Sequence, residues 1–311
     1  MQKREIHVTK KETVAKFSLI GLSLIFYILA LLYLPFILDT YFKFIPIRAN
    51  IGIDKNYIYI GIKLVVILFG SFIPFLIIKR VMNVSFSSFF KTTKIKFHEL
   101  IYHTIILIAI CSLLMFTMTI VNEFFPIYGS LLYPIGLTQG EEFLSNYIYI
   151  FLFVFVTPFI EEVIFRGILL RSLGRYGNYF AIITISIIYG LCNQSIGEII
   201  LAFVLSFYLI RITLRHKSIQ PAIFIHILFN AFFIGLQYIP AANYYITTGA
   251  FIFIYLISIF IILTGKLEPI KIKRNPSFQY VMSLFFSRLT IIIAVLLSIV
   301  YPVVKNIIIK L

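Results

Sequence analysis

Two adjacent glutamates, Glu161 and Glu162, lie inside a long apolar run, where ionisable side chains are costly. The chain has 12 acidic residues, and all except these two fall in termini, loops or near the ends of apolar runs. Arg166 follows Glu162 by four residues, so on a helix the two side chains share a face and form an ion pair. Glu161 then points roughly 100° away, so Glu162 is neutralised locally while Glu161 faces something else. The alternative is an ion pair that only locks two spans together.

A second polar pair, His226 and Asn230, has the same spacing within a later apolar run. Together an imidazole and an amide can donate hydrogen bonds to a developing oxyanion, although such pairs also hold membrane helices together. A third motif, Tyr189 with Asn193, places an aromatic ring and an amide four residues apart near the end of another apolar run. The alternative to a functional role for this pair is close helix packing at Gly190. A rise of about 1.5 Å per residue brings all three motifs to the middle of a membrane.

The elements that must position these residues are predicted to be membrane helices. Hydrophobic residues make up 61% of the 311-residue chain and charged residues only 13%, whereas soluble domains carry about 25% charged residues. We therefore expect an all-α, polytopic membrane helix bundle of about eight to nine transmembrane helices. The predicted spans are residues 17–38, 57–78, 100–120, 144–170, 178–193, 196–210, 219–238, 247–263 and 289–304.

Positive charge alternates between the loops of this arrangement. The net charge is +15, and lysines and arginines gather before the first span and after the second, fourth, sixth and eighth. This pattern places the N-terminus in the cytoplasm and the C-terminus outside, and it favours contact with membrane lipids over nucleic acid. Residues 81–99 and 276–287 are predicted to be interfacial and amphipathic. The expected regions are 1–140 with N-terminal spans, 141–245 with the motifs, and 246–311 with C-terminal spans.

These motifs resemble those of the CAAX-protease and bacteriocin-processing family, also called CPBP or Abi, over about residues 146–238. The family pattern Glu-Glu-x-x-x-Arg-Gly is complete from Glu161 to Gly167, and its late His-x-x-x-Asn is present at His226 and Asn230. The middle motif, normally Phe-x-x-x-His, reads Tyr-x-x-x-Asn and ends at Asn193. The order and spacing of the three motifs agree with the family.

The resemblance implies a role for each residue. The first glutamate activates a water with help from the histidine of the middle motif, and the late histidine and asparagine stabilise the oxyanion. The candidate catalytic residues are therefore Glu161, Asn193, His226 and Asn230, with Glu162 and Arg166 as structural support. No cofactor is expected. Zinc would find only Glu161 and His226 as ligands, which is a poor zinc site.

The resemblance implies an intramembrane endopeptidase of the plasma membrane that acts on a membrane-associated peptide or protein. Bacteriocin immunity or processing, peptide maturation and cell-surface regulation are the expected roles. Asn193 cannot accept a proton as histidine does, so we expect either a slow protease or one that has lost catalysis. The alternative is a catalytically inactive membrane scaffold that binds a partner membrane protein. A transporter is a third alternative, but one polar cluster is not a path of sites.

Overall fold

The computed structural model describes residues 10–37, 72–91, 95–124, 150–193, 195–237, 244–264 and 277–310, together with isolated positions at 61, 65, 69–70 and 147–148. Within these ranges the regular secondary structure is all-helical, as predicted. The helices of the first half are α1 (Lys10–Ile28), η1 (Leu29–Tyr33), α4 (Ile73–Val81), η3 (Phe86–Ser88), α5 (Phe97–Phe124), η5 (Leu152–Val156), α8 (Thr157–Glu161), η6 (Glu162–Leu169), α9 (Leu170–Leu173) and η7 (Gly174–Tyr176). The later helices are α10 (Asn178–Leu191), α11 (Ile196–His216), α12 (Gln220–Gln237), α13 (Tyr244–Leu263), α14 (Phe278–Phe286) and α15 (Leu289–Lys310).

The apolar character of the helices agrees with the prediction of a membrane bundle. The predicted number of eight to nine spans is not confirmed when the described helices are judged by their length and composition. Among the described residues, three helices are long and apolar enough to cross a membrane, at 10–37, 97–121 and 196–216. A fourth results if α14 and α15, which meet at a bend of 72°, count as one span. Shorter apolar helices cover 178–191, 220–236 and 248–263. Half of the predicted second span lies outside the described residues.

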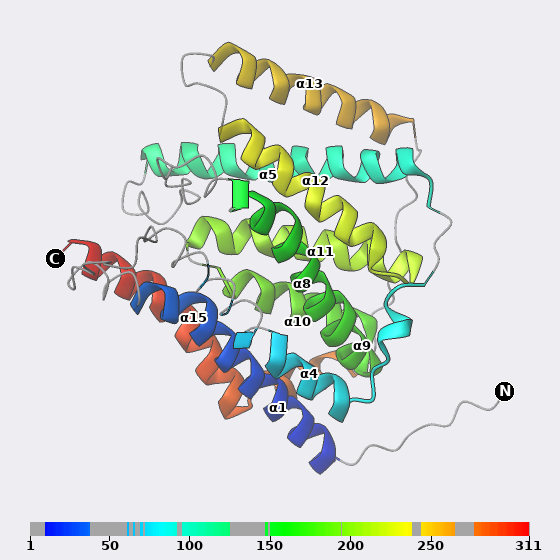
Figure 1. The fold of residues 1–311 in the computed structure, drawn as a ribbon, viewed down its shortest axis with the longest axis vertical. Coiled ribbons are helices and arrows are strands. Elements are labelled where there is room, and N and C mark those ends of the chain that lie inside the picture. Colours follow the sequence, from blue (N-terminus) through cyan, green and yellow to red (C-terminus); the bar gives the residue numbers. More distant parts are fainter. Residues whose placement is uncertain are drawn as a thin grey trace.

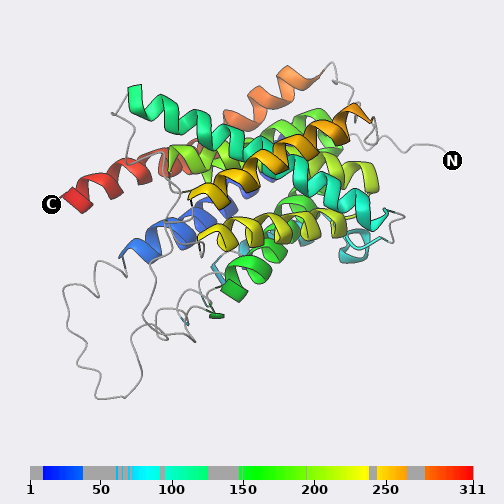
Figure 2. The same ribbon diagram turned by 90° about the horizontal axis from the view of Figure 1, so that it is seen from above.

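The helices form one bundle in which the first and last are neighbours (Figure 1). α1 packs beside α15, and both run in the same direction, so the start of α1 and the end of α15 lie at opposite ends of the bundle (Figures 1 and 2). α10 and α11 occupy the middle, and α5 packs against α11, α12 and α13 on the far side. The motif-bearing segment η5–α8–η6–α9 packs against α4, α10 and α12, between the α1–α15 pair and α5.

Specific polar contacts fix the packing of these apolar helices. His103 Nδ1 on α5 lies 2.7 Å from the Tyr208 hydroxyl on α11, a pairing that the sequence spacing did not indicate. On the other side of the bundle, the hydroxyl of Thr290 on α15 donates to the Ser18 carbonyl of α1 at 3.0 Å. Because apolar helices gain little from lipid exclusion alone, such interhelical bonds help to select one arrangement.

The two predicted interfacial segments are built differently from each other. In residues 277–287, α14 buries Val281 and Phe285, which are four residues apart and therefore share a helix face. In residues 81–91, the chain forms only the short 3₁₀ helix η3 and then an irregular stretch. Phe89 of this stretch is fully buried, and its carbonyl accepts a hydrogen bond from the Ile219 N–H at 2.9 Å.

Candidate active site

The paired glutamates lie on a helix whose hydrogen-bond pattern changes three times. Residues 152–156 and 162–169 are π-helical, and α8 lies between them with Pro158 in its first turn. Proline lacks a backbone N–H, but the first turn of a helix does not use that donor. π-helical segments are rare in proteins, and many of those that occur lie at functional sites. Glu161 ends α8 and Glu162 begins η6, so the two carboxylates leave the helix axis at a change of pitch.

Glu162 lies in a fully buried cluster of charged groups. Its Oε1 lies 3.1 Å from Arg166 Nη1 and 2.8 Å from His226 Nδ1. The side chains of Glu162 and Arg166 are both 0% exposed. The contact between Glu162 and Arg166 is an ion pair without hydrogen-bond geometry, since the guanidinium nitrogens have no hydrogen-bond partner among the described residues. A buried charge is tolerated only when it is paired, and each member of this cluster supplies that pairing.

Glu161 has a different environment, although it is the adjacent residue. Its Oε2 accepts a hydrogen bond from the Tyr189 hydroxyl at 2.6 Å and lies 4.0 Å from His226 Nε2. Its side chain is 20% exposed. The imidazole of His226 therefore lies between the two glutamates, with Nδ1 toward Glu162 and Nε2 toward Glu161. This arrangement leaves part of the Glu161 carboxylate accessible beside a nitrogen that can donate.

Tyr189 is held in place by packing on three sides. Its ring lies edge-on to Phe165 at 4.8 Å between centroids, and the guanidinium carbon of Arg166 lies 4.7 Å above its centre. The next residue, Gly190, allows α10 to approach α11, because a Cβ there would lie 2.7 Å from the Ile199 carbonyl oxygen. The cation over the ring and the close helix contact both restrict the phenol to the Glu161 side.

The two asparagines of the motifs bind backbone carbonyls. Asn230 Nδ2 donates to the Phe153 carbonyl at 3.0 Å. Phe153 lies in η5, where π-helical pairing changes the usual hydrogen-bond partners of the backbone. Asn193 Nδ2 donates to the carbonyls of Tyr189 and Gly190 at 2.9 and 3.1 Å. It therefore caps the end of its own helix, α10, where the Gly190 carbonyl also accepts from the Asn193 N–H at 3.1 Å.

The structure brings together most of the residues that the sequence predicted. Glu161, Glu162, Arg166 and His226 form one cluster, and Asn230 lies one helical turn from His226 on the same side of α12. The catalytic role predicted for Asn193 remains a prediction, because its amide nitrogen binds its own helix. Tyr189 is the residue that sequence reasoning undervalued, and its signal was its place one turn before Asn193 in the middle motif.

The donor set of this cluster does not fit a metal ion. Among the described residues, no group of three or more His, Cys, Asp or Glu side chains is gathered so that it could hold one. Glu162 Oε1 and His226 Nδ1 bind each other, so neither atom faces a shared ligand. The Arg166 cation at 3.1 Å from Glu162 would also repel a divalent ion.

Comparison with known proteins adds an independent observation on the same segment. Residues 143–232 match the family described as Type II CAAX prenyl endopeptidase Rce1-like, and the match includes all residues of the cluster. The curated protein named "Putative membrane peptidase YdiL" of Bacillus subtilis (strain 168) is 32% identical over 90 residues, which are 29% of this chain. The aligned part covers only 37% of that relative. No solved structure matches the chain.

Proposed function

We propose, from the premise that residues 143–232 form a domain of the CAAX protease family, that the chain is an intramembrane endopeptidase in which Glu161 activates water. One observation carries the proposal: Glu161 is partly exposed, bound by a phenol, and 4.0 Å from His226 Nε2. That separation is too long for a direct hydrogen bond and suits a shared water. A water there touches both a proton acceptor and an imidazole.

Charge balance supports the division of labour between the two glutamates. Two carboxylates and one guanidinium leave one negative charge in the cluster, and a protonated His226 neutralises it. In this state Nδ1–H donates to Glu162, and Nε2–H points toward the water and the substrate carbonyl. Arg166 is needed because it pairs with the buried carboxylate of Glu162, which in turn orients the imidazole.

The proposed reaction is hydrolysis of a peptide bond without a covalent intermediate. Glu161 accepts a proton from the water, and the water oxygen attacks the scissile carbonyl carbon. His226 Nε2–H donates a hydrogen bond to the oxyanion that forms. The protonated Glu161 then gives its proton to the leaving nitrogen as the carbon–nitrogen bond breaks. Tyr189 orients Glu161 throughout, in place of the histidine that the family carries at the position of Asn193.

The substrate that fits this site is a membrane-associated peptide or protein. The reacting groups are buried among apolar helices, so the scissile bond must enter from the membrane or its surface. We place the enzyme in the plasma membrane with its N-terminus in the cytoplasm, on the strength of the basic loops. Peptide maturation, bacteriocin processing or immunity, and cell-surface regulation are the roles that this chemistry serves.

A direct test compares protein termini in membranes from cells that carry the wild type, Glu161→Gln or the control Glu12→Gln at equal expression. Glu12 is exposed and pairs with Lys16 on the first helix, far in sequence from the site. We expect new termini with wild type and Glu12→Gln but not with Glu161→Gln, as measured by mass spectrometry. Identical termini in all three membranes, with Glu161→Gln folded, would contradict the protease function.

A second candidate function is a scaffold that binds a partner membrane protein without catalysis. Asn193 favours it, because the amide at this position binds the carbonyls of its own helix and cannot take part in proton transfer. A scaffold needs the shape of the cluster and not its base. It would therefore support the cell's phenotype equally well with Glu161→Gln, which keeps the side-chain shape.

A further inference from the structure

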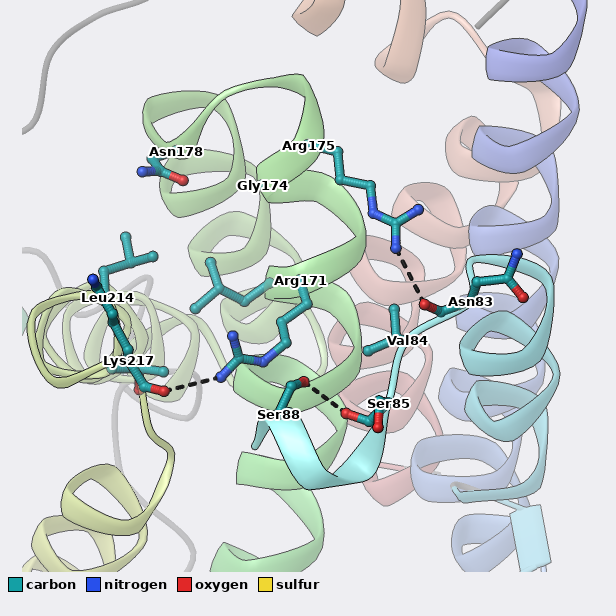
Figure 3. Close-up of a pocket in the computed structure, with 12 residues that line it drawn as sticks. Asn83, Val84, Ser85, Ser88, Arg171, Gly174, Arg175, Asn178, Leu214 and Lys217 are labelled. Atoms are coloured by element: carbon teal, nitrogen blue, oxygen red, sulfur yellow. Dashed lines mark hydrogen bonds between the residues drawn. The ribbon is translucent and has the colours of Figure 1, made fainter. Parts of the chain in front are cut away.

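A cavity lies at the end of the bundle where α4, α9 and α11 end (Figure 3), and none of its lining residues belongs to the glutamate cluster. Its volume is about 540 Å³, within the range of roughly 300–1,000 Å³ that is typical of small-molecule sites. Four parts of the chain contribute to it: the stretch after α4, the end of α9 with the following turn, the first residue of α10, and the end of α11. The lining residues are Asn83, Val84, Ser85, Ser88, Leu170, Arg171, Gly174, Arg175, Asn178, Thr213, Leu214 and Lys217.

Three cationic side chains line this cavity, and none of its described lining residues is acidic. Arg171 Nη2 donates to the Lys217 carbonyl at 3.3 Å, and Arg175 Nη2 donates to the Asn83 carbonyl at 3.3 Å (Figure 3). Each guanidinium carries five N–H donors, so most of this capacity is unused within the described residues. The Nε of Arg171 is buried and has no hydrogen-bond partner there.

The position of Arg171 is fixed by its surroundings. The guanidinium carbon of Arg171 lies 5.8 Å from the ring centre of Phe89, which is fully buried. Gly167, one turn earlier, leaves room for the same ring, because a Cβ there would lie 2.8 Å from it. The bond from Ile219 N–H to the Phe89 carbonyl then ties the cavity wall to the start of α12. Arg171 is thus held by packing and is less free than a surface side chain, whereas Arg175 and Lys217 are exposed.

Two simpler roles do not account for this arrangement. Basic residues often lie near helix ends because they neutralise the terminal carbonyls, and basic loops set membrane orientation. Either role is served by exposed, mobile side chains. Burial instead lowers the pKa of the Arg171 guanidinium from its ordinary value, so its surroundings disfavour an uncompensated charge. A half-buried guanidinium that is held by packing, has spare donors and lies beside two exposed cations gains from a bound anion.

We propose that this cavity binds a phosphate group. Arg171 and Arg175 bind its oxygens through their unused N–H donors, and Lys217 adds a third positive charge. Ser85 also lines the cavity, and its hydroxyl supplies a neutral donor when it accepts from the Ser87 hydroxyl at 2.7 Å. The Ser88 hydroxyl donates to the Ser85 carbonyl. Arginine forks match the geometry of phosphate oxygens, and the absence of a lining carboxylate among the described residues leaves nothing to repel the anion.

The phosphate has two possible sources, an anionic lipid headgroup and a soluble phosphate compound. The apolar residues Val84, Leu170 and Leu214 in the wall allow a headgroup to bind with its glycerol against them. The basic loops place this end of the bundle at the cytoplasmic surface, where both sources are available. The inference does not depend on the proposed proteolysis, because none of its residues belongs to the glutamate cluster.

The lipid source is tested with the purified full chain in phosphatidylcholine nanodiscs that contain a small fraction of phosphatidylglycerol. Native mass spectrometry counts the phosphatidylglycerol molecules that remain bound to wild type and to Arg171→Gln/Arg175→Gln. A second variant, Lys217→Asn, guards against misfolding, because Lys217 is exposed with φ of 54° and asparagine tolerates that backbone conformation. The control is Arg80→Gln, which removes an exposed cation that does not line the cavity.

The soluble source is tested by titration of the same proteins in pure phosphatidylcholine nanodiscs with inorganic phosphate. For whichever of the two probes represents the natural ligand, we expect wild type and Arg80→Gln to bind it with equal affinity. The double arginine variant should bind it more weakly by about tenfold or more. Lys217→Asn should show a smaller loss. Retention of phosphatidylglycerol alone identifies a lipid, and binding of phosphate alone identifies a soluble ligand. Equal binding of both probes by wild type and the double variant, or an equal loss in Arg80→Gln, overturns the proposal.

Discussion

Glu161 and Glu162 are adjacent in sequence and opposite in environment. Glu162 is fully buried, and its Oε1 contacts a guanidinium and an imidazole. Glu161 is 20% exposed, accepts one hydrogen bond from a phenol, and is separated from the imidazole by 4.0 Å. One carboxylate can therefore organise a site and leave its neighbour for the proposed chemistry, as when two carboxylates take separate roles because their environments differ.

The sharpest test of this contrast is Glu161→Gln. We expect it to lower the rate of cleavage by about 10²–10⁴, the usual contribution of a positioned base. The free energy of unfolding should change by less than about 1 kcal/mol, because glutamine keeps the acceptor for Tyr189. Turnover of the cleaved protein identified from the membrane termini measures the first quantity, and chemical unfolding in mixed micelles measures the second. Retained turnover would mean that Glu161 is not the base.

At the ion pair of Glu162 and Arg166 we expect a large change in the free energy of unfolding, in contrast to the small change expected at Glu161. Arg166→Met leaves the Glu162 carboxylate buried without its guanidinium and should lower the free energy of unfolding by about 3–5 kcal/mol. The double variant Arg166→Met/Glu162→Gln removes the unpaired charge, so it should recover part of this loss. Unfolding followed by circular dichroism measures both. A single variant as stable as wild type would show that Arg166 does not balance Glu162.

Tyr189→Phe removes the only group described here that holds Glu161 through a hydrogen bond, while the ring packing remains. A hydrogen bond to a charged group contributes about 1.5–3 kcal/mol, so the cleavage rate should fall by about tenfold or more. Because the phenol positions a base, the variant should also change the pH profile of kcat, whereas a loss of packing alone would not. Unchanged kinetics would show that Tyr189 does not position Glu161, and Asn193 would then be the candidate functional residue of the middle motif.

Asn193→Ala should have the smallest effect of the series. It removes two hydrogen bonds to carbonyls at the end of α10, and their loss should lower the free energy of unfolding by about 0.5–1.5 kcal/mol. The cleavage rate should fall less than in Tyr189→Phe, because the amide nitrogen does not reach Glu161. A complete loss of cleavage in a folded variant would instead support the catalytic role that the family motif implies for Asn193.

The sequence predicted the parts of this structure that depend on local spacing. The four-residue interval between Glu162 and Arg166 predicted their contact, and apolar length predicted the helices around 100–120 and 196–210. It did not predict the bond between His103 and Tyr208, which joins residues 105 positions apart. Nor did it predict the position of Tyr189, since the approach of its helix depends on Gly190 and Ile199 of the next helix. Contacts of this kind arise from packing between spans, which no local pattern encodes.

The π-helical segment η6 has a consequence for which mutations the protein can tolerate. A π segment can be regarded as an α-helix that has accepted one additional residue. Deleting one residue among 167–169 would therefore allow the segment to relax to an α-helix while Glu161 and Arg171 keep nearly the same relative direction. The same deletion in an ordinary α-helix such as α10 or α11 would turn its two ends by roughly 100° relative to each other. We therefore expect η6 to tolerate the loss of one apolar residue after Arg166 better than its α-helical neighbours do.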